Sequence, residues 1–310
     1  MSTAVLIPCY NEAKTIKKVV EDFKREMPHA QIYVYDNNST DGTDIIAREA
    51  GATVRYEYRQ GKGNVVRSMF RDIDADCYIM VDGDDTYDAS FGPVLEKEIL
   101  EGRADMAVGD RLSSTYFSEN KRAFHNFGNV LVRKLINLLF KSRLNDIMTG
   151  ARAFNKMFVK SYPVISKGFE LETEMTIFAL NYNMRIAEKP IQYKDRPAGS
   201  ESKLNTFKDG FKVLKTIGEL FKDTRPFAFF SIISSILILV SMCFFIPILI
   251  EFFHTGEVAK FPTLIIISAV LVIAVMNFFC GILLSVIKKK DRQDFERSLN
   301  ILAEVWKKGQ

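Results

Sequence analysis

The sequence predicts an α/β domain built on a mostly parallel sheet, followed by a hairpin of two membrane-spanning helices. Three observations lead to this fold class. Strand-like and helix-like segments alternate from residue 4 to about residue 82, polar clusters follow the strands, and two long uncharged apolar stretches lie late in the chain. Alternation of strands and helices is typical of a parallel sheet with covering helices.

Seven elements account for the alternating region. The expected strands are residues 4–8, 32–36, 53–58 and 77–82, and the expected helices are residues 13–26, 41–50 and 63–73. Ligands of such folds bind beyond the carboxyl ends of the strands. The polar residues at these ends are Tyr10, Asn11 and Glu12 after the first strand, Asp36, Asn37 and Asn38 after the second, and Asp82, Asp84 and Asp85 after the fourth. We therefore expect a pocket along one rim of the sheet.

A dinucleotide-binding domain is disfavoured by the turn after the first strand. Such domains carry GxGxxG there, which lets a pyrophosphate approach the N-terminus of the next helix. This chain has IPCYNEAK instead, and its GKG at Gly61–Gly63 is too weak a signal alone. A nicotinamide-dependent enzyme is therefore not expected.

Composition indicates a mixed soluble and membrane protein in a reducing compartment. The 310 residues are 47% hydrophobic and 26% charged, with a formal net charge of +4. Cys9, Cys77, Cys243 and Cys280 form no CxxC pair, so neither a disulfide framework nor a zinc site is expected. The N-terminus has no basic leader, and its apolar run is too short for a signal peptide.

Two stretches without a formal charge, Phe227–Ile250 and Thr263–Ile287, predict transmembrane helices. Each exceeds the roughly 20 residues that cross the hydrocarbon layer, and buried helices of soluble proteins are seldom apolar on all faces for so long. The basic residues that flank the pair are Lys222, Arg225, Lys288, Lys289, Lys290 and Arg292, whereas the turn carries Lys260 alone. This bias predicts a multi-pass protein of the inner (plasma) membrane with the catalytic domain and both termini in the cytoplasm.

Three further segments have helical amphipathic patterns. Residues 204–225 predict a helix at the inner membrane surface, with an ordinary domain helix as the alternative, and His125–Phe140 has the same two interpretations. Residues 291–310 predict a cytosolic helix. The expected division is a catalytic domain at 1–203, a juxtamembrane helix at 204–225, a transmembrane hairpin at 226–290 and a C-terminal helix at 291–310.

Four ordered motifs resemble those of the family 2 glycosyltransferases of GT-A fold. They are IPCYNEA, YVYDNNSTDGT, GKGNVVRSMF and MVDGDDTYD. The later motifs MTGARAF, GFELETEM and RPAGSESKL, followed by two spans, are similar to those of polyprenyl-phosphate hexosyltransferases. These enzymes are relatives of dolichyl-phosphate mannose synthase and of the bacterial undecaprenyl-phosphate glucosyl- and N-acetylglucosaminyltransferases. The resemblance covers about residues 3–290 and implies a Rossmann-like GT-A domain with helices on both faces of its sheet.

The resemblance implies roles for the residues of the predicted pocket. Breaking a nucleotide sugar leaves negative charge on the nucleoside diphosphate, which Mg²⁺ or Mn²⁺ held by carboxylates neutralises. Asp82 and Asp84 match the metal-associated DxD motif, with Asp84 also expected to be catalytic, and Asp36 matches the residue that binds the nucleotide base. The other expected donor-binding residues are Pro8, Tyr10, Asn11, Glu12 and Lys62.

Simpler interpretations exist for several of these residues. An Asp-rich turn with helix-capping function is the alternative for the DxD segment. Asn11 and either Ser39 or Thr40 can be N-caps of the helices that follow them, a role that can coexist with lining the pocket. Lys62 can be a solvated loop lysine rather than a ligand of the donor phosphate.

The implied acceptor is polyprenyl phosphate, whose oxygen is already ionised at pH 7, so a strong general base is less needed than for an alcohol. Asp146 matches the carboxylate proposed as base or acceptor-orienting group. Glu172 and Glu174 are alternative bases, and an acid that only fixes a loop is another interpretation of Asp146. The basic residues that match acceptor-phosphate positions are Arg111, Arg122, Arg196 and Lys203. Because the donor and the acceptor both carry phosphate, the basic residues can be explained without a nucleic-acid partner.

The expected reaction is inverting transfer of one hexose from UDP-glucose or UDP-N-acetylglucosamine to undecaprenyl phosphate on the cytosolic leaflet. The alternatives are a GDP-mannose donor, a sugar or protein acceptor, and an inactive membrane adaptor that keeps the fold. A processive polysaccharide synthase is disfavoured because the single tryptophan, Trp306 in EVWKK, does not form a QxxRW motif. The hairpin also allows a homo-oligomer, since two spans bury little surface by themselves.

Overall fold

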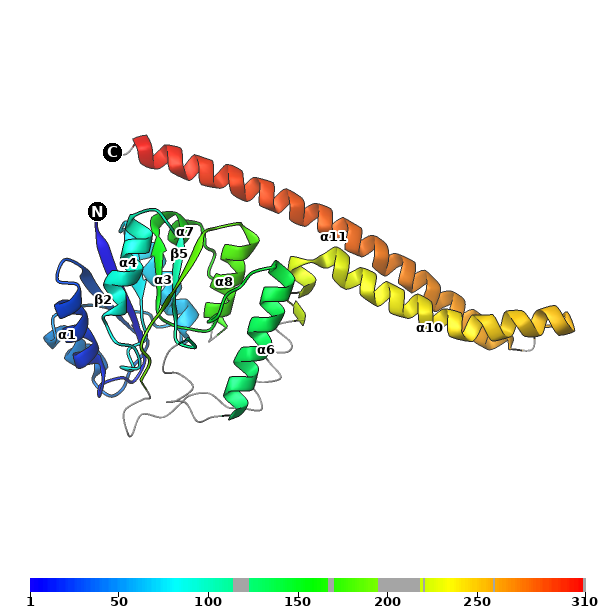
Figure 1. Ribbon diagram of the computed structural model, residues 1–310, viewed down its shortest axis with the longest axis horizontal. Helices are drawn as coiled ribbons and strands as arrows, with labels where there is room; N and C mark the ends of the chain where they lie inside the picture. Colours follow the sequence, from blue (N-terminus) through cyan, green and yellow to red (C-terminus); the bar gives the residue numbers. More distant parts are fainter. Residues whose placement is uncertain (114–122, 167–169, 195–217, 220, 259, 309–310) are drawn as a thin grey trace. The chain divides into compact units, whose positions relative to one another are not determined.

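The computed structural model describes residues 1–113, 123–166, 170–194, 218–219, 221–258 and 260–308. The chain forms two compact units, residues 1–210 and 211–310. The first unit carries the sheet, and the second carries two long helices (Figure 1). The expected juxtamembrane helix at 204–225 lies mostly outside the described residues, so its amphipathic character stays a prediction.

The first unit is built on a seven-stranded sheet in the order β3-β2-β1-β4-β6-β5-β7. The strands are β1 Thr3–Cys9, β2 Gln31–Asp36, β3 Thr53–Tyr56, β4 Cys77–Met80, β5 Met106–Asp110, β6 Arg152–Asn155 and β7 Ile186–Pro190. All neighbouring pairs are parallel except those of β6, which runs antiparallel to β4 and β5. The N-terminal end of β6 therefore lies at the same edge as the carboxyl ends of the other strands.

The helices of this unit flank the sheet, except for α6, which lies beside α8 (Figure 1). They are α1 Ile16–Glu26, α2 Thr43–Glu49, α3 Lys62–Asp72, α4 Phe91–Leu100, α6 Ala123–Phe140, α7 Lys156–Ser161 and α8 Leu171–Asn181. The predicted alternation of strands and helices up to residue 82 is confirmed. Two strands end earlier than expected, β3 at Tyr56 and β4 at Met80, so Asp82 belongs to the turn after β4.

Alternating side chains of the strands fill two cores, one on each face of the sheet. Val5 and Ile7 of β1 belong to the core that also includes Phe23 of α1 and Leu95 of α4. On the other face, the ring of Phe70 in α3 packs edge to face on Tyr78 of β4 and Phe154 of β6, with centroids 6.4 and 5.6 Å apart. Packing on both faces holds the strands in place, and with them the edge at which the polar loops after β1, β2 and β4 begin.

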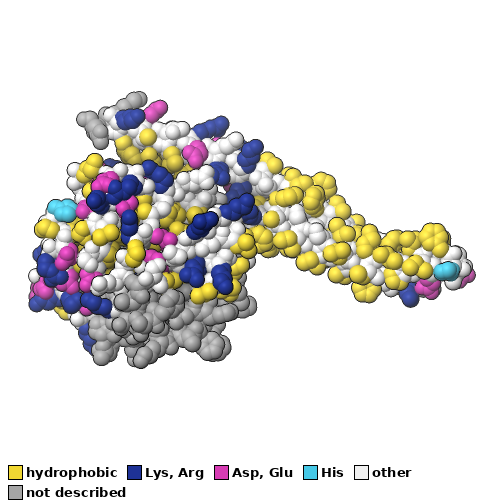
Figure 2. All heavy atoms as spheres, in the orientation of Figure 1, with side chains coloured by type: hydrophobic (Ala, Val, Ile, Leu, Met, Phe, Trp, Pro, Cys, Tyr) yellow, Lys and Arg dark blue, Asp and Glu magenta, His cyan; other side chains and the backbone are white. Residues whose placement is uncertain are grey.

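The second unit consists of α10 Pro226–Thr255 and α11 Phe261–Lys308. Both are long and apolar enough to cross a membrane. Helix α10 starts with Pro226, whose fixed φ suits a first helical position, and stops at Gly256 with φ 75°, the left-handed geometry of a helix end. Figure 2 shows apolar side chains over most of this pair and charged side chains at the tip.

Small residues form the seam between α10 and α11. The hydroxyl of Ser234 donates to the carbonyl of Ala274 at 2.7 Å. A Cβ at Gly281 would lie 2.9 Å from Phe230 Cβ, so glycine permits the close approach of the two helices there. Phe230 lies beside Gly281 and Ser234 beside Ala274, so the residue number rises along α10 while it falls along α11, and the two helices are antiparallel. Small residues are typical of close helix packing in membranes.

Helix α11 continues without interruption from the second apolar stretch into the charged tail. The sequence predicts a separate C-terminal helix from residue 291. In the structure the segment 291–308 is helical, but it extends the helix that begins at Phe261. No glycine or proline occurs between Gly281 and Lys308, so nothing in the local sequence ends the helix there.

Candidate active site

Four carboxylates surround the end of β1. Burial, followed by the charges of Glu12, Asp36, Asp82 and Asp84, raises the pKa of the Cys9 thiol well above its ordinary value. The geometry brings the same residues together. Cys9 pairs in register with Asp36, and a Cβ at Gly83, the residue between Asp82 and Asp84, would lie 2.8 Å from Cys9 Sγ and 3.7 Å from Glu12 Cγ. Their loops follow β1, β2 and β4, as expected for the carboxyl ends of parallel strands.

Asp82 is held between a lysine and a glycine. Lys62 Nζ lies 2.5 Å from Asp82 Oδ1 and 2.5 Å from Glu172 Oε1. Burial alone would lower the pKa of Lys62, but Asp82 and Glu172 raise it above its ordinary value, so the side chain is an ammonium. On the other side, a Cβ at Gly150 would collide with the Asp82 carboxylate. A side chain at position 150, two residues before β6, would therefore force the Asp82 carboxylate to move.

Asp84 is buried and is oriented by the next turn residues. Its Oδ1 accepts hydrogen bonds from the hydroxyl and the backbone N–H of Thr86, at 2.7 and 3.3 Å. Asp85 has φ 57°, and its carboxylate pairs with Lys18 at 2.6 Å. It is therefore engaged outside the pair formed by Asp82 and Asp84. The DxD segment is thus a fixed turn with two inward carboxylates, Asp82 and Asp84.

These two carboxylates fit a cation that is completed by the substrate. Among the described residues, no group of three or more His, Cys, Asp or Glu is arranged to hold a metal ion by itself. Mg²⁺ in phosphate-binding sites commonly takes one or two carboxylates together with phosphate and water oxygens. The donor set of Asp82 and Asp84 matches that pattern.

Asp36 has a buried carboxylate oxygen that receives no hydrogen bond from the described residues. The residue is 3% exposed, and its Oδ2 accepts a hydrogen bond from the backbone N–H of Ser39 at 3.0 Å. Its Oδ1 is buried and has no hydrogen-bond partner among the described residues. An unsatisfied buried acceptor is costly, so this oxygen is suited to a ligand N–H.

The first two loops of the site hold each other in place. The N–H of Asn11 donates to Ser39 Oγ, and the N–H of Thr40 donates to Asn11 Oδ1, each at 2.9 Å. The N–H of Glu12 donates to Thr43 Oγ1 at 2.8 Å. The N-caps of α1 and α2 are Thr15 and Gly42. The capping interpretation of Asn11, Ser39 and Thr40 is therefore wrong, because these residues bridge two loops instead.

Pro8 and Tyr10 bracket the end of β1. Pro8 is buried and pairs in register with Tyr35 of β2, beyond the last residue that β1 pairs with β4. A proline donates no backbone hydrogen bond, and this position requires none on the β4 side. Tyr10 is partly exposed at the rim, where its ring is accessible to a ligand.

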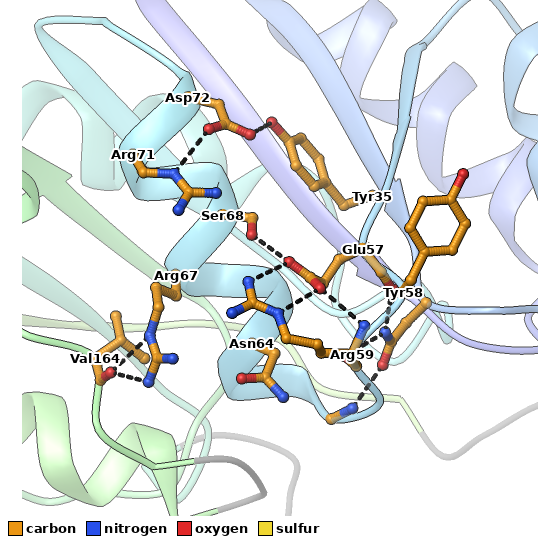
Figure 3. A network of polar contacts seen from close by, with 12 residues as sticks. Tyr35, Glu57, Tyr58, Arg59, Asn64, Arg67, Ser68, Arg71, Asp72 and Val164 are labelled. Carbon is orange, nitrogen blue, oxygen red and sulfur yellow. Dashed lines mark hydrogen bonds and ion pairs between the residues drawn. The ribbon is translucent and has the colours of Figure 1, made fainter.

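A polar network fixes the loop that leads to Lys62 (Figure 3). Asn37 Nδ2 donates to the carbonyls of Glu57 and Arg59 at 2.6 and 2.9 Å, and its Oδ1 accepts from the N–H of Gly61 at 2.7 Å. Arg59 donates twice to the Glu57 carboxylate, which also accepts from Ser68 Oγ at 2.5 Å. Chiefly because of Arg59, the pKa of Glu57 falls to about 2.

Asp146 forms a buried pair with Arg111. Arg111 Nε and Nη2 donate to the two carboxylate oxygens at 2.7 and 3.0 Å, and its backbone N–H donates to Oδ2 at 3.1 Å. The guanidinium also lies over the ring of Tyr193, 5.5 Å from its centroid. Since both oxygens of Asp146 are engaged with a cation, the geometry suits a positioning group better than a proton acceptor.

Three residues to which the sequence assigned no role complete this region. The hydroxyl of Tyr87 accepts from the N–H of Gly150 at 2.9 Å, which ties the DxD segment to the glycine that abuts Asp82. Arg152 is fully buried and donates to the carbonyls of Ile147 and Thr149 at 2.6 and 3.0 Å. The motif MTGARAF contains both Gly150 and Arg152. The sequence of the motif alone does not show that Gly150 lies against a carboxylate or that Arg152 holds the loop.

The remaining predicted residues fall into two groups. Glu172 lies with Lys62 and Asp82, whereas the Glu174 carboxylate accepts from the N–H groups of Ile165 and Ser166 at 3.1 and 2.8 Å and so holds a loop. The basic positions Arg122, Arg196 and Lys203 lie outside the described residues. Arg111 is therefore the one predicted acceptor-phosphate residue for which the structure gives a geometry.

The sheet domain is similar to known glycosyltransferases. Residues 4–162 match the family model for glycosyl transferase family 2. Glycosyltransferase AglJ from Haloferax volcanii is 32% identical over 230 residues, which cover 74% of this chain and 75% of that protein. The dolichyl-phosphate hexose transferase of the same organism is 29% identical over 222 residues, which cover 72% of this chain and 95% of that protein.

A solved structure has a fold similar to that of the sheet domain. Glucosyl-3-phosphoglycerate synthase from Mycobacterium tuberculosis, in complex with Mn²⁺, UDP-glucose and phosphoglyceric acid, is similar with a TM-score of 0.55 at 21% identity, over 71% of this chain and 79% of that one. This likeness confirms the GT-A fold predicted for the sheet domain. With a family model that spans half of the sequence, the chain is a glycosyltransferase that belongs to glycosyl transferase family 2.

Proposed function

We propose that this glycosyltransferase transfers one hexose, with inversion, from UDP-glucose or UDP-N-acetylglucosamine to polyprenyl phosphate on the cytosolic leaflet. The observation that carries the proposal is the cluster of Glu12, Asp36, Asp82 and Asp84 around Cys9, in a chain that also has two apolar helices long enough to cross a membrane. The name of the relative that transfers hexose to dolichyl phosphate supports a lipid phosphate as acceptor.

The donor is proposed to bind with its base at Asp36 and its diphosphate near Asp82 and Asp84. The unpartnered Oδ1 of Asp36 accepts a base N–H, a charge-assisted bond of the stronger class. Tyr10 and the bridged loops around Asn11 and Glu12 line the nucleotide. Asp82 and Asp84 hold Mg²⁺ or Mn²⁺, which when bound neutralises charge on the leaving nucleoside diphosphate.

The acceptor side is proposed to require orientation more than proton abstraction. A phosphate oxygen is ionised at pH 7 and attacks without losing a proton. Asp146 binds Arg111 through both of its oxygens, so we assign Asp146 the role of positioning Arg111, which is assigned to the acceptor phosphate. The resemblance implies the same role for Arg122, Arg196 and Lys203. Glu172, the alternative base, is paired with Lys62 and is not needed for this step.

The proposal places the enzyme in the inner membrane with the catalytic domain on the cytoplasmic side. Helices α10 and α11 form the spanning hairpin, and the basic residues Lys222, Arg225 and Lys288–Lys290 flank its open end. A cytoplasmic active site matches the location of nucleotide sugars, and the hairpin brings it to a lipid acceptor.

The test is product formation by the purified full-length protein with undecaprenyl phosphate. UDP-glucose, UDP-N-acetylglucosamine and GDP-mannose are supplied as radiolabelled donors, each with Mg²⁺, with Mn²⁺ and with a chelator. We expect a lipid-linked product from one UDP-sugar, lost with the chelator. Asp84→Asn keeps an oxygen that accepts the hydrogen bonds of Thr86 but removes a negative charge. The turnover rate of this variant should fall by about 10²–10³, the loss expected when one group that stabilises developing charge is removed.

The outcomes separate the candidate functions. A product from GDP-mannose alone would replace the proposed donor and keep the acceptor. Absence of a lipid product from every donor, with a folded protein, would contradict the polyprenyl phosphate acceptor and favour either another acceptor or an inactive adaptor. A product that forms equally well with the chelator would contradict the metal dependence.

A further inference from the structure

The ammonium of Lys62 lies between two carboxylates that are distant in the sequence. Its contacts at 2.5 Å are Asp82, in the turn after β4, and Glu172, in the first turn of α8. Lys62 therefore occupies one oxygen of a carboxylate that the proposed function assigns to a divalent cation. Two cations at one oxygen repel each other strongly at such a separation, so the contact has consequences for cation binding.

The two carboxylates depend on Lys62 to different degrees. The side chain of Glu172 is 5% exposed, whereas that of Asp82 is 28% exposed. A buried carboxylate left without a paired cation is strongly destabilising, while a partly solvated carboxylate loses its partner at a lower cost. In an exchange of partners, Lys62 is expected to remain with Glu172 and to release Asp82.

The backbone of Lys62 is fixed although its side chain can move. Gly61 precedes α3 with φ 124°, and its N–H donates to Asn37 Oδ1 at 2.7 Å. Lys62 is thereby the first residue of α3. The flexible four-carbon stem of a lysine lets the ammonium shift without any change of the backbone.

We propose that Lys62 is an exchangeable counter-ion of Asp82, which opposes divalent-cation binding in the empty donor site and is retained by Glu172 when the cation binds. The inference rests on the proposed metal-dependent function. It has a second consequence, because a nucleoside diphosphate offers Lys62 new acceptor oxygens. Cation and nucleotide should therefore bind with positive coupling, and Lys62 should account for part of that coupling.

The experiment is a calorimetric titration of Mn²⁺ into the full-length protein, without nucleotide and with saturating UDP. Lys62→Met removes the ammonium and keeps the length of the side chain. Lys18→Met is the matched control, because Lys18 pairs with Asp85 in the same turn and its loss removes an equal charge. Melting temperatures report whether each variant is folded.

A second pair of variants covers the case in which Lys62→Met does not fold. Glu172 is left buried without a partner in Lys62→Met, whereas Lys62→Met combined with Glu172→Gln removes both charges together. Glu172→Gln alone is the reference for this double variant, since the two differ only in the ammonium of Lys62.

Loss of Lys62 should tighten Mn²⁺ binding without nucleotide by about tenfold or more in both pairs, and should reduce the gain in affinity that UDP produces. Lys18→Met should change the affinity by less than about threefold. Equal or weaker binding after loss of Lys62, or an equal effect of Lys18→Met, overturns the inference and leaves the proposed function intact. A wild-type protein that binds no Mn²⁺, with or without UDP, overturns both.

Discussion

At the scale of single residues, Asp36 combines burial with an incomplete set of hydrogen bonds. One oxygen accepts from Ser39, and the other has no partner in the part of the chain that the structure describes. Most buried acceptors in folded proteins are satisfied. The residue is therefore maintained at some cost to the free form of the protein, and a bound ligand is the natural source of the missing donor.

Asp36→Asn tests this interpretation. The amide keeps the size of the side chain but offers a donor where the ligand donates, so the dissociation constant of UDP should rise by about 10–100-fold, corresponding to a lost charge-assisted hydrogen bond. Titration calorimetry with UDP measures it. The melting temperature should stay equal or rise, because a buried unpaired charge is removed. Unchanged UDP affinity in the variant would show that Asp36 does not contact the nucleotide.

Glu57 makes stability depend on pH. Its pKa falls from 4.5 to about 2, chiefly through Arg59. Because the folded pKa is the lower one, the unfolded chain binds more protons, and the contribution is complete above about pH 5 and is lost as the pH falls toward 2. It amounts to at most about 3 kcal/mol, reduced by solvent screening because the Arg59 side chain is 56% exposed.

The measurement compares the melting temperatures of the wild type and Glu57→Gln in detergent. The wild type should melt higher at pH 7, and the difference should shrink steadily between pH 5 and pH 3. Asp74→Asn, which alters the exposed pair with Lys156, serves as a control with little effect at any pH. A difference between wild type and Glu57→Gln that stays constant from pH 7 to pH 3 would exclude the Arg59 pairing as its source.

The sequence predicts some residues of the site and misses others for a physical reason. Asp36, Asp82 and Asp84 are predictable because each follows a strand, and parallel strands end at one edge. The pairing of Lys62 with Glu172 joins positions 110 residues apart. It depends on how α8 packs, and the run of buried residues on that helix gives no amphipathic pattern from which one inward face can be inferred.

At the scale of elements, strand β6 decides how the site is closed. It is the strand that runs opposite to its neighbours, and so it places Gly150 beside Asp82 at the edge where β1, β2 and β4 end. The alternation of strands and helices up to residue 82 gives no indication of such a reversal. Strand direction is set by the connection before β6, and that connection includes a long helix, α6, rather than a short turn.

The seam of the hairpin gives a prediction at this scale. Gly281→Leu places a large side chain where even a Cβ would approach Phe230, so it should force α10 and α11 apart and cost about 1–3 kcal/mol. The melting temperature in detergent measures the loss. Ala269→Leu is the control, because Ala269 lies on the exposed side of α11. Equal melting temperatures for Gly281→Leu and Ala269→Leu would contradict the helix pairing.

At the scale of the whole molecule, the chain joins a GT-A domain to a pair of helices with the composition of membrane spans. The change in composition is abrupt, and for this reason the sequence alone predicts a pair of apolar helices after an alternating α/β region. The sequence could not show that α11 extends beyond the apolar stretch, because a charged helical segment has the same pattern whether or not it continues from a span.

The proposed topology predicts which positions a membrane-impermeant maleimide labels in intact cells. In a background that lacks Cys243 and Cys280, Glu257→Cys in the turn should be labelled from outside, since it lies at the tip of the hairpin. Ser2→Cys should be labelled after permeabilisation alone, while Cys9 and Cys77 are buried and stay unlabelled. Labelling of Ser2→Cys in intact cells would contradict a cytoplasmic catalytic domain.

The uninterrupted helix α11 also has a mechanical consequence. Lys308 lies 18 positions beyond Lys290 in this helix, a distance of about 27 Å at a rise of 1.5 Å per residue. A rigid rod of this length acts as a lever: if the span tilts by about 20°, a common inclination in bilayers, the far end is displaced by about 9 Å. A change in the tilt of the proposed span would therefore move the C-terminal end of α11.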